Sequence, residues 1–395
     1  MTNYKNKYLK YKLKFEKMIN QQMINQNGGM ESSSGLSEQR KQEILDYFKS
    51  IINDIELEKF QKVLDNDPTI YKNYLNLSKI GAPVVKDLTE ILKHNTTLTR
   101  LSFHNNNIGV PGAKHFAEML QYNTTLQELH LGSNEIGAAG TKHLAEILKH
   151  NTTLQKLELG NNEIGAAGAK HLAEMLKYNT TLQELNLGSN EIGTAGTKHL
   201  ANALKHNTTL QLLNLANNEI GAAGVNDIVK MLKHNATLQE LQLASNEIGD
   251  PGARELAEAL DQNTTLKDLS LANNNIGYAG IKYLAEVLEE NTTLQTLTLD
   301  NNKWCKKSKR ALLESLKHNT TLEEIDLGWD GEDEDIEDQI FDIVTTNSEH
   351  NRAARSRERA RKRARERARE RERAAERLNE TFDSLEDLEN YNDNL

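Results

Sequence analysis

Hydrophobic residues along this chain return in a fixed order every 28 residues. In the copy that begins at Asn151, Leu157 and Leu159 have the spacing that places both side chains on one face of a strand. Leu172 and Leu176 follow at the spacing of one helical turn. The pattern therefore predicts a unit made of a strand, a turn, a helix and a return loop.

The repeat frame is continuous from Asn95 to Leu322, without insertion or deletion. Each copy opens with Asn-Thr-Thr-Leu, except for one Asn-Ala-Thr-Leu, and the opening residues are Asn95, Asn123, Asn151, Asn179, Asn207, Asn235, Asn263, Asn291 and Asn319. One such unit cannot bury its own apolar side, whereas stacked units can. A fixed period of this length therefore predicts an array in which each unit packs on its neighbours.

Asn and Gly recur in the turns between strand and helix. An Asn follows each strand, at Asn106, Asn134, Asn162, Asn190, Asn218, Asn246, Asn274 and Asn302. We expect its amide to bond backbone groups of its own turn and of the next repeat. Gly165 and its equivalents are expected to allow a tight turn or a close backbone approach. The Asn after each helix, such as Asn151, suits a left-handed helix C-terminus.

Strand and helix spacings predict the curvature of the array. Paired strands lie about 4.8 Å apart, whereas packed helices need about 8–10 Å. The sheet must therefore form the inner wall of an arc. The predicted fold class is α/β: a curved solenoid, or horseshoe, with a parallel sheet on the concave face, helices on the convex face, and helical or disordered termini on either side.

The repeated set LxxLxLxxNxIGxxGxxxLAxxL, over roughly residues 70–328, resembles the leucine-rich repeat family. The likeness is to the ribonuclease-inhibitor-like class, which has a full helix in each repeat. Some relatives with helical repeats and acidic tails activate a small GTPase, and others cap actin filaments. No motif in this sequence carries either activity over, because a shared fold does not by itself establish a function.

Composition and repeat quality divide the chain into five regions. Residues 1–36 are a basic leader and linker, and 37–94 are an N-terminal helical cap with a degenerate first repeat at 68–94. Residues 95–328 are the leucine-rich repeat array. Residues 329–351 are an acidic C-terminal cap segment, in which Ile336, Ile340, Phe341 and Ile343 are expected to cover the last strand. Residues 352–395 are an Arg-rich tail with an acidic end, where the Leu378–Leu388 face suggests a coiled coil or docking helix.

The formal net charge of −10 and a single cysteine describe a chain without a disulfide framework. Lysines interrupt the apolar residues of the leader, which is therefore a poor secretory signal, and no apolar run approaches membrane-spanning length. We expect a cytoplasmic protein that is not secreted. The phrase Lys7–Lys12 resembles leaders of giant DNA virus proteins, which would make the virion or the host cytoplasm its location.

The sequence gives little support for catalysis, and we predict no enzyme, cofactor or metal site. His115, His143, His171 and His199 recur on successive helices, too far apart to share an ion with ligands at about 2 Å. The Glu column at Glu135, Glu163, Glu191, Glu219 and Glu247 is copied in every repeat, as a solvated edge would be. Cys305 has no adjacent His–acid arrangement and is interpreted as a thiol packed in the cap.

The residues that vary while the frame repeats are the outward positions of the strands, and these are the positions free to recognise a partner. The candidate partner-binding residues are Arg100, His130, Lys156, Glu184, Leu212 and Glu240. Leu212 interrupts a charged column, and no framework role requires an exposed leucine there. These columns contain no Trp or Tyr, the residues that usually dominate binding energy. We therefore predict a protein-interaction scaffold with a polar interface, whose partner and oligomeric state the sequence leaves open.

Nucleic-acid binding is the alternative. From Arg355 to Arg373 every second residue is Arg, and this spacing leaves no apolar stripe on a helix. The candidate nucleic-acid-binding residues are Arg355, Arg357, Arg359, Arg361, Arg363 and Arg365, which can neutralise phosphates. Interspersed glutamates dilute the charge, and acidic segments on both sides offer the arm other partners.

Overall fold

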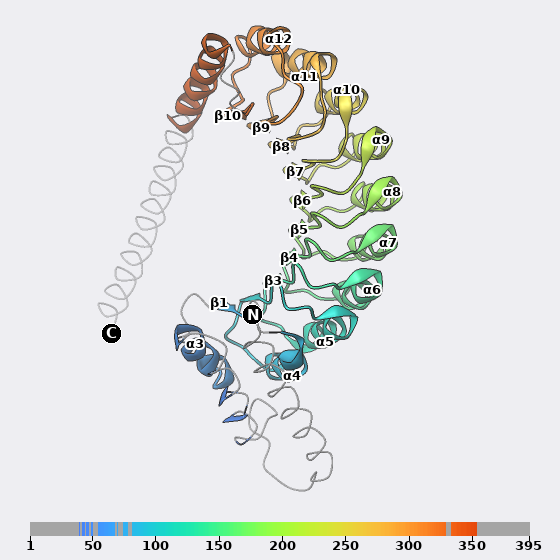
Figure 1. The fold of residues 1–395 in the computed structure, drawn as a ribbon, viewed down its shortest axis with the longest axis vertical. Helices are drawn as coiled ribbons and strands as arrows, with labels where there is room; N and C mark the ends of the chain where they lie inside the picture. Colours follow the sequence, from blue (N-terminus) through green and yellow to red (C-terminus); the bar gives the residue numbers. More distant parts are fainter. Residues whose placement is uncertain are drawn as a thin grey trace, which may run out of the picture.

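The computed structural model describes residues 39, 42, 43, 45, 46, 49, 54–67, 69, 74–77, 81–328 and 333–353. Along these residues strands and helices alternate, with the strands on the inner side of an arc and the helices on its outer side (Figure 1). The predicted fold is therefore confirmed: a curved α/β solenoid with a parallel sheet on its concave face.

The described strands form one parallel sheet in sequence order. They are β1 (Tyr74–Asn76), β2 (Arg100–Ser102), β3 (Glu128–His130), β4 (Lys156–Glu158), β5 (Glu184–Asn186), β6 (Leu212–Asn214), β7 (Glu240–Gln242), β8 (Asp268–Ser270), β9 (Thr296–Thr298) and β10 (Glu324–Asp326). From β2 onward, each residue pairs with the residue 28 positions further along the chain. The sequence period and the structural register are thus the same quantity.

The helices stack in the same order outside the sheet. They are α3 (Asp54–Leu64), the 3-10 turn η2 (Ala82–Val84), α4 (Val85–Lys93), α5 (Gly109–Tyr122), α6 (Gly137–Leu148), α7 (Gly165–Leu176), α8 (Gly193–Leu204), α9 (Gly221–Leu232), α10 (Gly249–Leu260), α11 (Tyr278–Glu290) and α12 (Lys306–Leu316). Between the two layers the repeated leucines, such as Leu157, Leu159 and Leu172, are fully buried. Burial of each such side chain stabilises the fold by about 1.5–3 kcal/mol.

In most repeats the two turn glycines serve different purposes, and both expected roles, a tight turn and a close approach, occur. Gly165 begins α7 with φ near +60°, a conformation that glycine adopts without steric cost. Gly168 faces the preceding helix instead. A Cβ there would lie 2.4 Å from Ile164 Cγ2 and 3.3 Å from the Ala138 Cα, so the lack of a side chain lets neighbouring helices approach.

The Asn column after the strands forms a ladder of hydrogen bonds. Asn190 donates from Nδ2 to the carbonyls of Leu187 and Gly188 in its own turn, and to that of Leu159 in the repeat before it. Its Oδ1 accepts the backbone N–H of Asn162, also in the preceding repeat. The predicted bonds within the turn are present, but the neighbour that the side chain bonds is the preceding repeat, not the next one.

The Asn residues that open each repeat do not adopt the left-handed conformation that their position after a helix predicts. Asn123 has φ −72° and ψ 122°, which is extended backbone. These side chains bridge two turns instead. In Asn179, Oδ1 accepts the N–H groups of Thr181 and Leu182, and Nδ2 donates to the carbonyl of Leu148 at the end of the preceding helix. The amide therefore satisfies a helix-end carbonyl and fixes the start of the next unit.

Left-handed backbone occurs instead on both sides of the buried Asn ladder. Asn161 and Glu163, which flank Asn162, each have φ near +56°, and the equivalent residues of the other central repeats behave alike. Asn adopts this conformation readily, whereas a residue such as Glu does so at a steric cost. Asn107 and Asn275 occupy the position of Glu163 in two other repeats. The chain thus already contains the better residue at this position.

We expect Glu163→Asn to raise the free energy of unfolding by up to about 1 kcal/mol, because it relieves left-handed strain. The same change in α7, Glu174→Asn, should lower stability by up to about 0.7 kcal/mol, because Asn is a poorer helix former than Glu. Urea unfolding of the two variants measures both effects. A destabilised Glu163→Asn would contradict the prediction.

The first repeat departs from the period by two residues. Tyr74 pairs with Arg100, a separation of 26 residues, although Leu88 in α4 and Phe116 in α5 keep the separation of 28. The predicted degenerate repeat therefore contains a strand and a helix, but its strand lies two residues later than the period places it. This shift brings Tyr74 onto the concave face beside Arg100.

A helical segment of residues 334–353 covers the other end of the sheet. Ile336 and Ile340 are buried and Ile343 is partly buried against the core, as expected, whereas Phe341 is 64% exposed, so its predicted burial is wrong. Asn347, one period after Asn319, donates to the carbonyls of Asn319 and Leu322. The covering helix thus supplies the Asn that a further repeat would have placed there.

Some predictions concern parts of the chain outside the described residues. These are the leader, the Arg-rich segment with its six candidate arginines, and the Leu378–Leu388 face. The five region boundaries also remain predictions. Within the described residues, no helix has the length and apolarity needed to cross a membrane.

Candidate functional site

Three-residue strands build the concave wall, which we define as the outward side chains of β1 to β10. In nearly every strand the middle residue, such as Leu185 of β5, is buried, and the residues on either side face outward. Because the strands are in register, outward residues form two columns across the sheet. Adjacent members of a column are about 4.8 Å apart, close enough for direct contact between side chains.

The structure brings the six predicted partner-binding residues together on this wall. The first column contains Arg100, Lys156, Glu184, Leu212 and Glu240, on β2, β4, β5, β6 and β7, and His130 belongs to the second column on β3. All six side chains are half-buried. Leu212 is therefore less exposed than the sequence suggests, because it lies between Glu184 and Glu240.

Opposite charges lie close together, within strands and across them, at the β3–β5 part of the wall. Lys156 Nζ lies 2.8 Å from Glu184 Oε2 and 3.5 Å from Glu158 Oε1. The hydrogen bond to Glu184 raises the pKa of Lys156 above its usual value. His130 Nε2 lies 3.7 Å from Glu128 Oε2. In this part of the wall, one lysine therefore serves two carboxylates, and Glu128 has His130 beside it.

Carboxylates gather further along the same column. Gln242 Nε2 bridges two of them, 3.4 Å from Glu240 Oε1 and 3.2 Å from Asp268 Oδ1. Burial raises the pKa of both carboxyls, and repulsion by Asp268 raises that of Glu240 further. Negative charge on this part of the wall is therefore stabilised less well than in water.

The wall also contains an aromatic residue that the sequence analysis missed. The guanidinium of Arg100 lies 5.7 Å from the ring centroid of Tyr74, within the range of a cation–π contact. The fixed 28-residue period places Tyr74 in a different column from Arg100. Because β1 is shifted by two residues, this pair could not be predicted from the period.

A groove of about 560 Å³ follows the edge of the wall where β2 to β6 end. Its polar lining includes His104, His130, Glu158, Asn186 and Asn214, and the small residues that follow the strands also line it. At Gly132 a Cβ would lie 2.7 Å from His104 Nδ1, so glycine keeps this part of the groove open. The repeat pattern alone did not indicate this role for the glycines that follow the strands.

Other predicted columns lie away from the wall. The histidines at 115, 143, 171 and 199 are partly or fully exposed on the outer helices, and the Glu column at 135, 163, 191, 219 and 247 is exposed on the loops. Within the described residues, no group of three or more His, Cys, Asp or Glu side chains is placed to hold a metal ion. Neither column forms a compact site.

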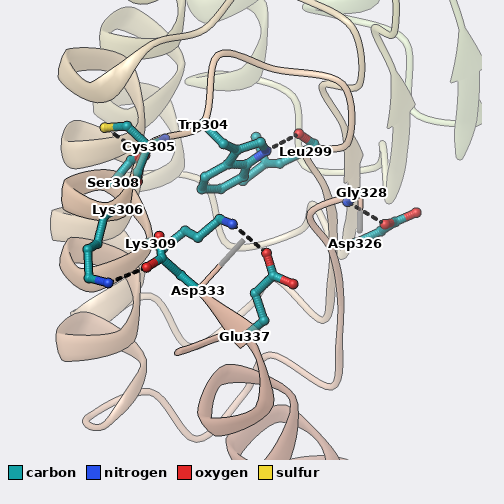
Figure 2. Close-up of polar contacts among 10 residues, drawn as sticks. All are labelled: Leu299, Trp304, Cys305, Lys306, Ser308, Lys309, Asp326, Gly328, Asp333 and Glu337. Carbon is teal, nitrogen blue, oxygen red and sulfur yellow. Dashed lines mark hydrogen bonds and ion pairs between the residues drawn. The ribbon is translucent and has the colours of Figure 1, made fainter. Parts of the chain in front are cut away.

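Cys305 is exposed at the start of α12, so its interpretation as a packed thiol is wrong. The Ser308 hydroxyl hydrogen-bonds the thiol, and this contact and the neighbouring backbone N–H groups lower the pKa of Cys305. Nearby, Trp304 takes the turn position of the usual Ile and donates to the carbonyl of Leu299 at 3.2 Å (Figure 2). Trp304 is thus the residue that packs against the core at this turn.

A buried ion pair joins the array to its C-terminal helix (Figure 2). Lys309 Nζ of α12 lies 2.6 Å from Glu337 Oε1, and the two side chains are only 2% and 6% exposed. Lys306 pairs with Asp333 at the surface beside it. These contacts fix the helix of residues 334–353 over the last repeat, beside one end of the concave wall.

Comparison with protein families agrees with this architecture. The family model described as TMOD/LMOD Leucine-rich domain matches residues 53–164 and 245–370, which together are more than half of the chain. A second model, described as Leucine Rich repeat, matches residues 178–201 and 206–229. The chain belongs to the leucine-rich repeat family. A comparison with curated proteins found no match to this leucine-rich repeat protein.

Three solved structures illustrate what this leucine-rich repeat protein is similar to. Leiomodin-1 Actin-Binding Site 2 is 23% identical over 48% of this chain and 94% of its own, with a TM-score of 0.35. The tropomodulin C-terminal domain of Caenorhabditis elegans is 16% identical over 40% and 97%, with a TM-score of 0.37. The chain in the TLR13–ssRNA13 complex is 22% identical over 65% of this chain and 32% of its own, with a TM-score of 0.39.

Proposed function

We propose that this leucine-rich repeat protein is a non-catalytic scaffold that binds another protein on its concave wall. The observation that carries the proposal is the contrast between constant and variable positions in one strand. The buried middle leucine is the same from β2 to β9, whereas the outward residues beside it change from repeat to repeat. Variable side chains on a rigid frame are typical of a recognition surface.

The proposed interface is centred on Glu184, Leu212 and Glu240. Leu212 provides apolar area between two carboxylates, and the adjacent groove gives a partner backbone room along the strand ends. Arg100 and Tyr74 add the type of side chain that contributes most to interfaces. The support for a non-catalytic role is the match to leucine-rich repeat models, since such repeats generally serve as binding scaffolds.

The test is capture of proteins from a cell lysate by the intact chain and by Glu184→Lys/Leu212→Arg. We expect the double variant to lose its specific partners, because it replaces the apolar contact and inverts charge at the centre of the wall. Glu174→Lys/Tyr178→Arg is the matched control, since it makes the same charge change and removes an exposed apolar side chain on the outer side. An unchanged set of partners for both variants would exclude the wall.

Two family-level alternatives enter the same experiment. The match to the TMOD/LMOD domain model supports an actin-capping relative only at the level of the family. Adding purified actin as a separate prey tests it directly, and a GTPase-activating role is tested by the rate of GTP hydrolysis in captured fractions. Binding of actin by the intact chain but not by the wall variant would join this alternative to the proposed site.

A further inference from the structure

Within the residues that the structure describes, the outward side chains at the far part of the concave wall include no cation, although Arg352 lies beside them. We call this part the acidic end and define it by the outward residues of β7 to β10, which are Glu240, Gln242, Asp268, Ser270, Thr296, Thr298, Glu324 and Asp326. Four of these are carboxylates and the others are neutral. Among the described residues, the ion pairs of the wall involve Glu128, His130, Lys156, Glu158 and Glu184, and none includes a carboxylate of the acidic end.

Charge at the acidic end is held under unfavourable conditions. Burial raises the pKa of both Glu240 and Asp268, and repulsion by a neighbouring carboxylate adds to the effect at each. The amide of Gln242 offsets this only in part. A cationic group placed against these side chains would therefore gain more than it gains at an ordinary exposed carboxylate.

The described chain ends beside this surface. Asn351 donates to the Thr320 carbonyl in the loop before β10. Arg352 lines one pocket of about 450 Å³ together with Thr296 and Glu324, which belong to the acidic end. The last turn of the 334–353 helix therefore lies at the edge of the wall, near β10 (Figure 1).

The next residues in the sequence have the complementary charge. Residues 355–373 contain ten arginines, at every second position, together with Lys362 and four glutamates. In an extended chain, alternate side chains share one face, so this spacing would present every arginine to a single surface. Nineteen extended residues span roughly 60 Å, whereas β10 to β7 span only about 14 Å. The segment is therefore long enough to cross the whole acidic end.

We propose that the Arg-rich segment 355–373 binds the acidic end of the concave wall of its own chain and thereby occupies part of the partner-binding surface. Docking itself does not depend on the proposed scaffold function, but the regulatory consequence does. A partner that binds the wall must displace the segment. Alternatively, it must bind a chain whose Arg-rich segment is already bound to anions other than those of the wall. The segment thus acts as a competing ligand joined to the site, at a high effective concentration.

The experiment titrates a fluorescent peptide of residues 354–374 onto full-length chains. The first chain is the wild type, the second carries all ten arginines of 355–373 changed to Gln, and the third adds Glu240→Gln, Asp268→Asn and Glu324→Gln to the second. We expect the peptide to bind the second chain, and to bind the third chain roughly tenfold more weakly, as the loss of about three ion pairs would give. It should bind the wild type at least as weakly as the third chain, because the chain's own segment competes for the site. Binding should also weaken with salt.

A matched control removes the same charge elsewhere. Glu163→Gln, Glu191→Gln and Glu219→Gln, on the Arg-to-Gln background, alter three exposed loop carboxylates outside the wall, and peptide affinity should not change. Circular dichroism of each chain verifies folding. Equal binding to the second and third chains would overturn the acidic end as the site, and equal binding to the wild type and the second chain would overturn occupation by the chain's own segment.

Two further measurements test the other molecules that the Arg-rich segment could bind: a second copy of the chain and nucleic acid. Sedimentation of the wild type should give a monomer, and a dimer that the ten Arg→Gln changes abolish would overturn binding within one chain. Retention of RNA by the wild type, together with absence of peptide binding to any chain, would overturn the proposal in favour of nucleic acid. Loss of lysate partners in the Glu184→Lys/Leu212→Arg variant is a separate result, so failure of the scaffold proposal leaves the peptide test intact.

Discussion

Asn190→Ala should lower the free energy of unfolding by about 2–5 kcal/mol, because each buried polar group left without a partner costs about 1–3 kcal/mol. Asn190 is fully buried and bonds backbone groups of two repeats, among them the Asn162 N–H at 2.9 Å and the Leu159 carbonyl at 2.9 Å. Alanine leaves the N–H groups of Asn162 and Ile164 without this acceptor, whereas the Leu159 carbonyl keeps its bond from Asn162 Nδ2. Urea unfolding monitored by circular dichroism measures the loss.

Hydrogen exchange locates the same effect along the chain. The amides of Asn162 and Ile164 both point to Asn190 Oδ1, at 2.9 and 3.4 Å, so their protection should fall most. Asn202→Ala, an exposed residue of α8, is the control and should change stability little, because Ala is a better helix former than Asn. A loss below about 0.5 kcal/mol for Asn190→Ala would mean that the ladder is not a major stabilising element.

Lys309→Met should destabilise the chain by about 3–5 kcal/mol, because it leaves the Glu337 carboxylate buried without its cation. The two side chains lie 2.6 Å apart and are almost completely excluded from solvent. We expect the double variant Lys309→Met/Glu337→Leu to recover most of this loss, since an apolar pair of similar size avoids the cost of burying charge. Thermal and urea unfolding of the three chains measure the effect.

An exposed ion pair of similar length provides the control. Lys317 Nζ lies 2.7 Å from Glu314 Oε1, but the side chains are 46% and 70% exposed. Lys317→Met should therefore cost less than about 1 kcal/mol. If Lys309→Met were equally mild, the C-terminal helix would not depend on its buried pair, and the attachment of that helix beside the wall would need another explanation.

The repeat period determined most of the fold in advance. Leu157, Leu159 and Leu172 lie in the core as their spacing indicates, and Gly165 has the left-handed backbone of a tight turn. The same period predicted that outward residues from different repeats lie side by side. The register confirms this placement for five of the six candidates in one column and for His130 in the other.

The predictions that were wrong are those made from local sequence patterns at positions where contacts between repeats determine the conformation. Asn after a helix suggests left-handed backbone, yet Asn179 is held by the Leu148 carbonyl of the preceding unit. The left-handed position belongs to Glu163, whose chemistry gives no sign of it. Tyr74 escaped notice because its strand is shifted. Phe341 was expected to be buried, but its helix turns only one face to the core and leaves it exposed.

The seams between neighbouring repeats are nearly interchangeable, because each uses the same Asn, the same glycines and the same strand register. In-frame loss or gain of one 28-residue block would create a junction that the protein already contains. Unequal recombination within such a coding sequence would therefore lengthen or shorten the arc, and the protein would still fold after each such step. The breadth of the inner surface is thus a trait that evolution can adjust in whole steps.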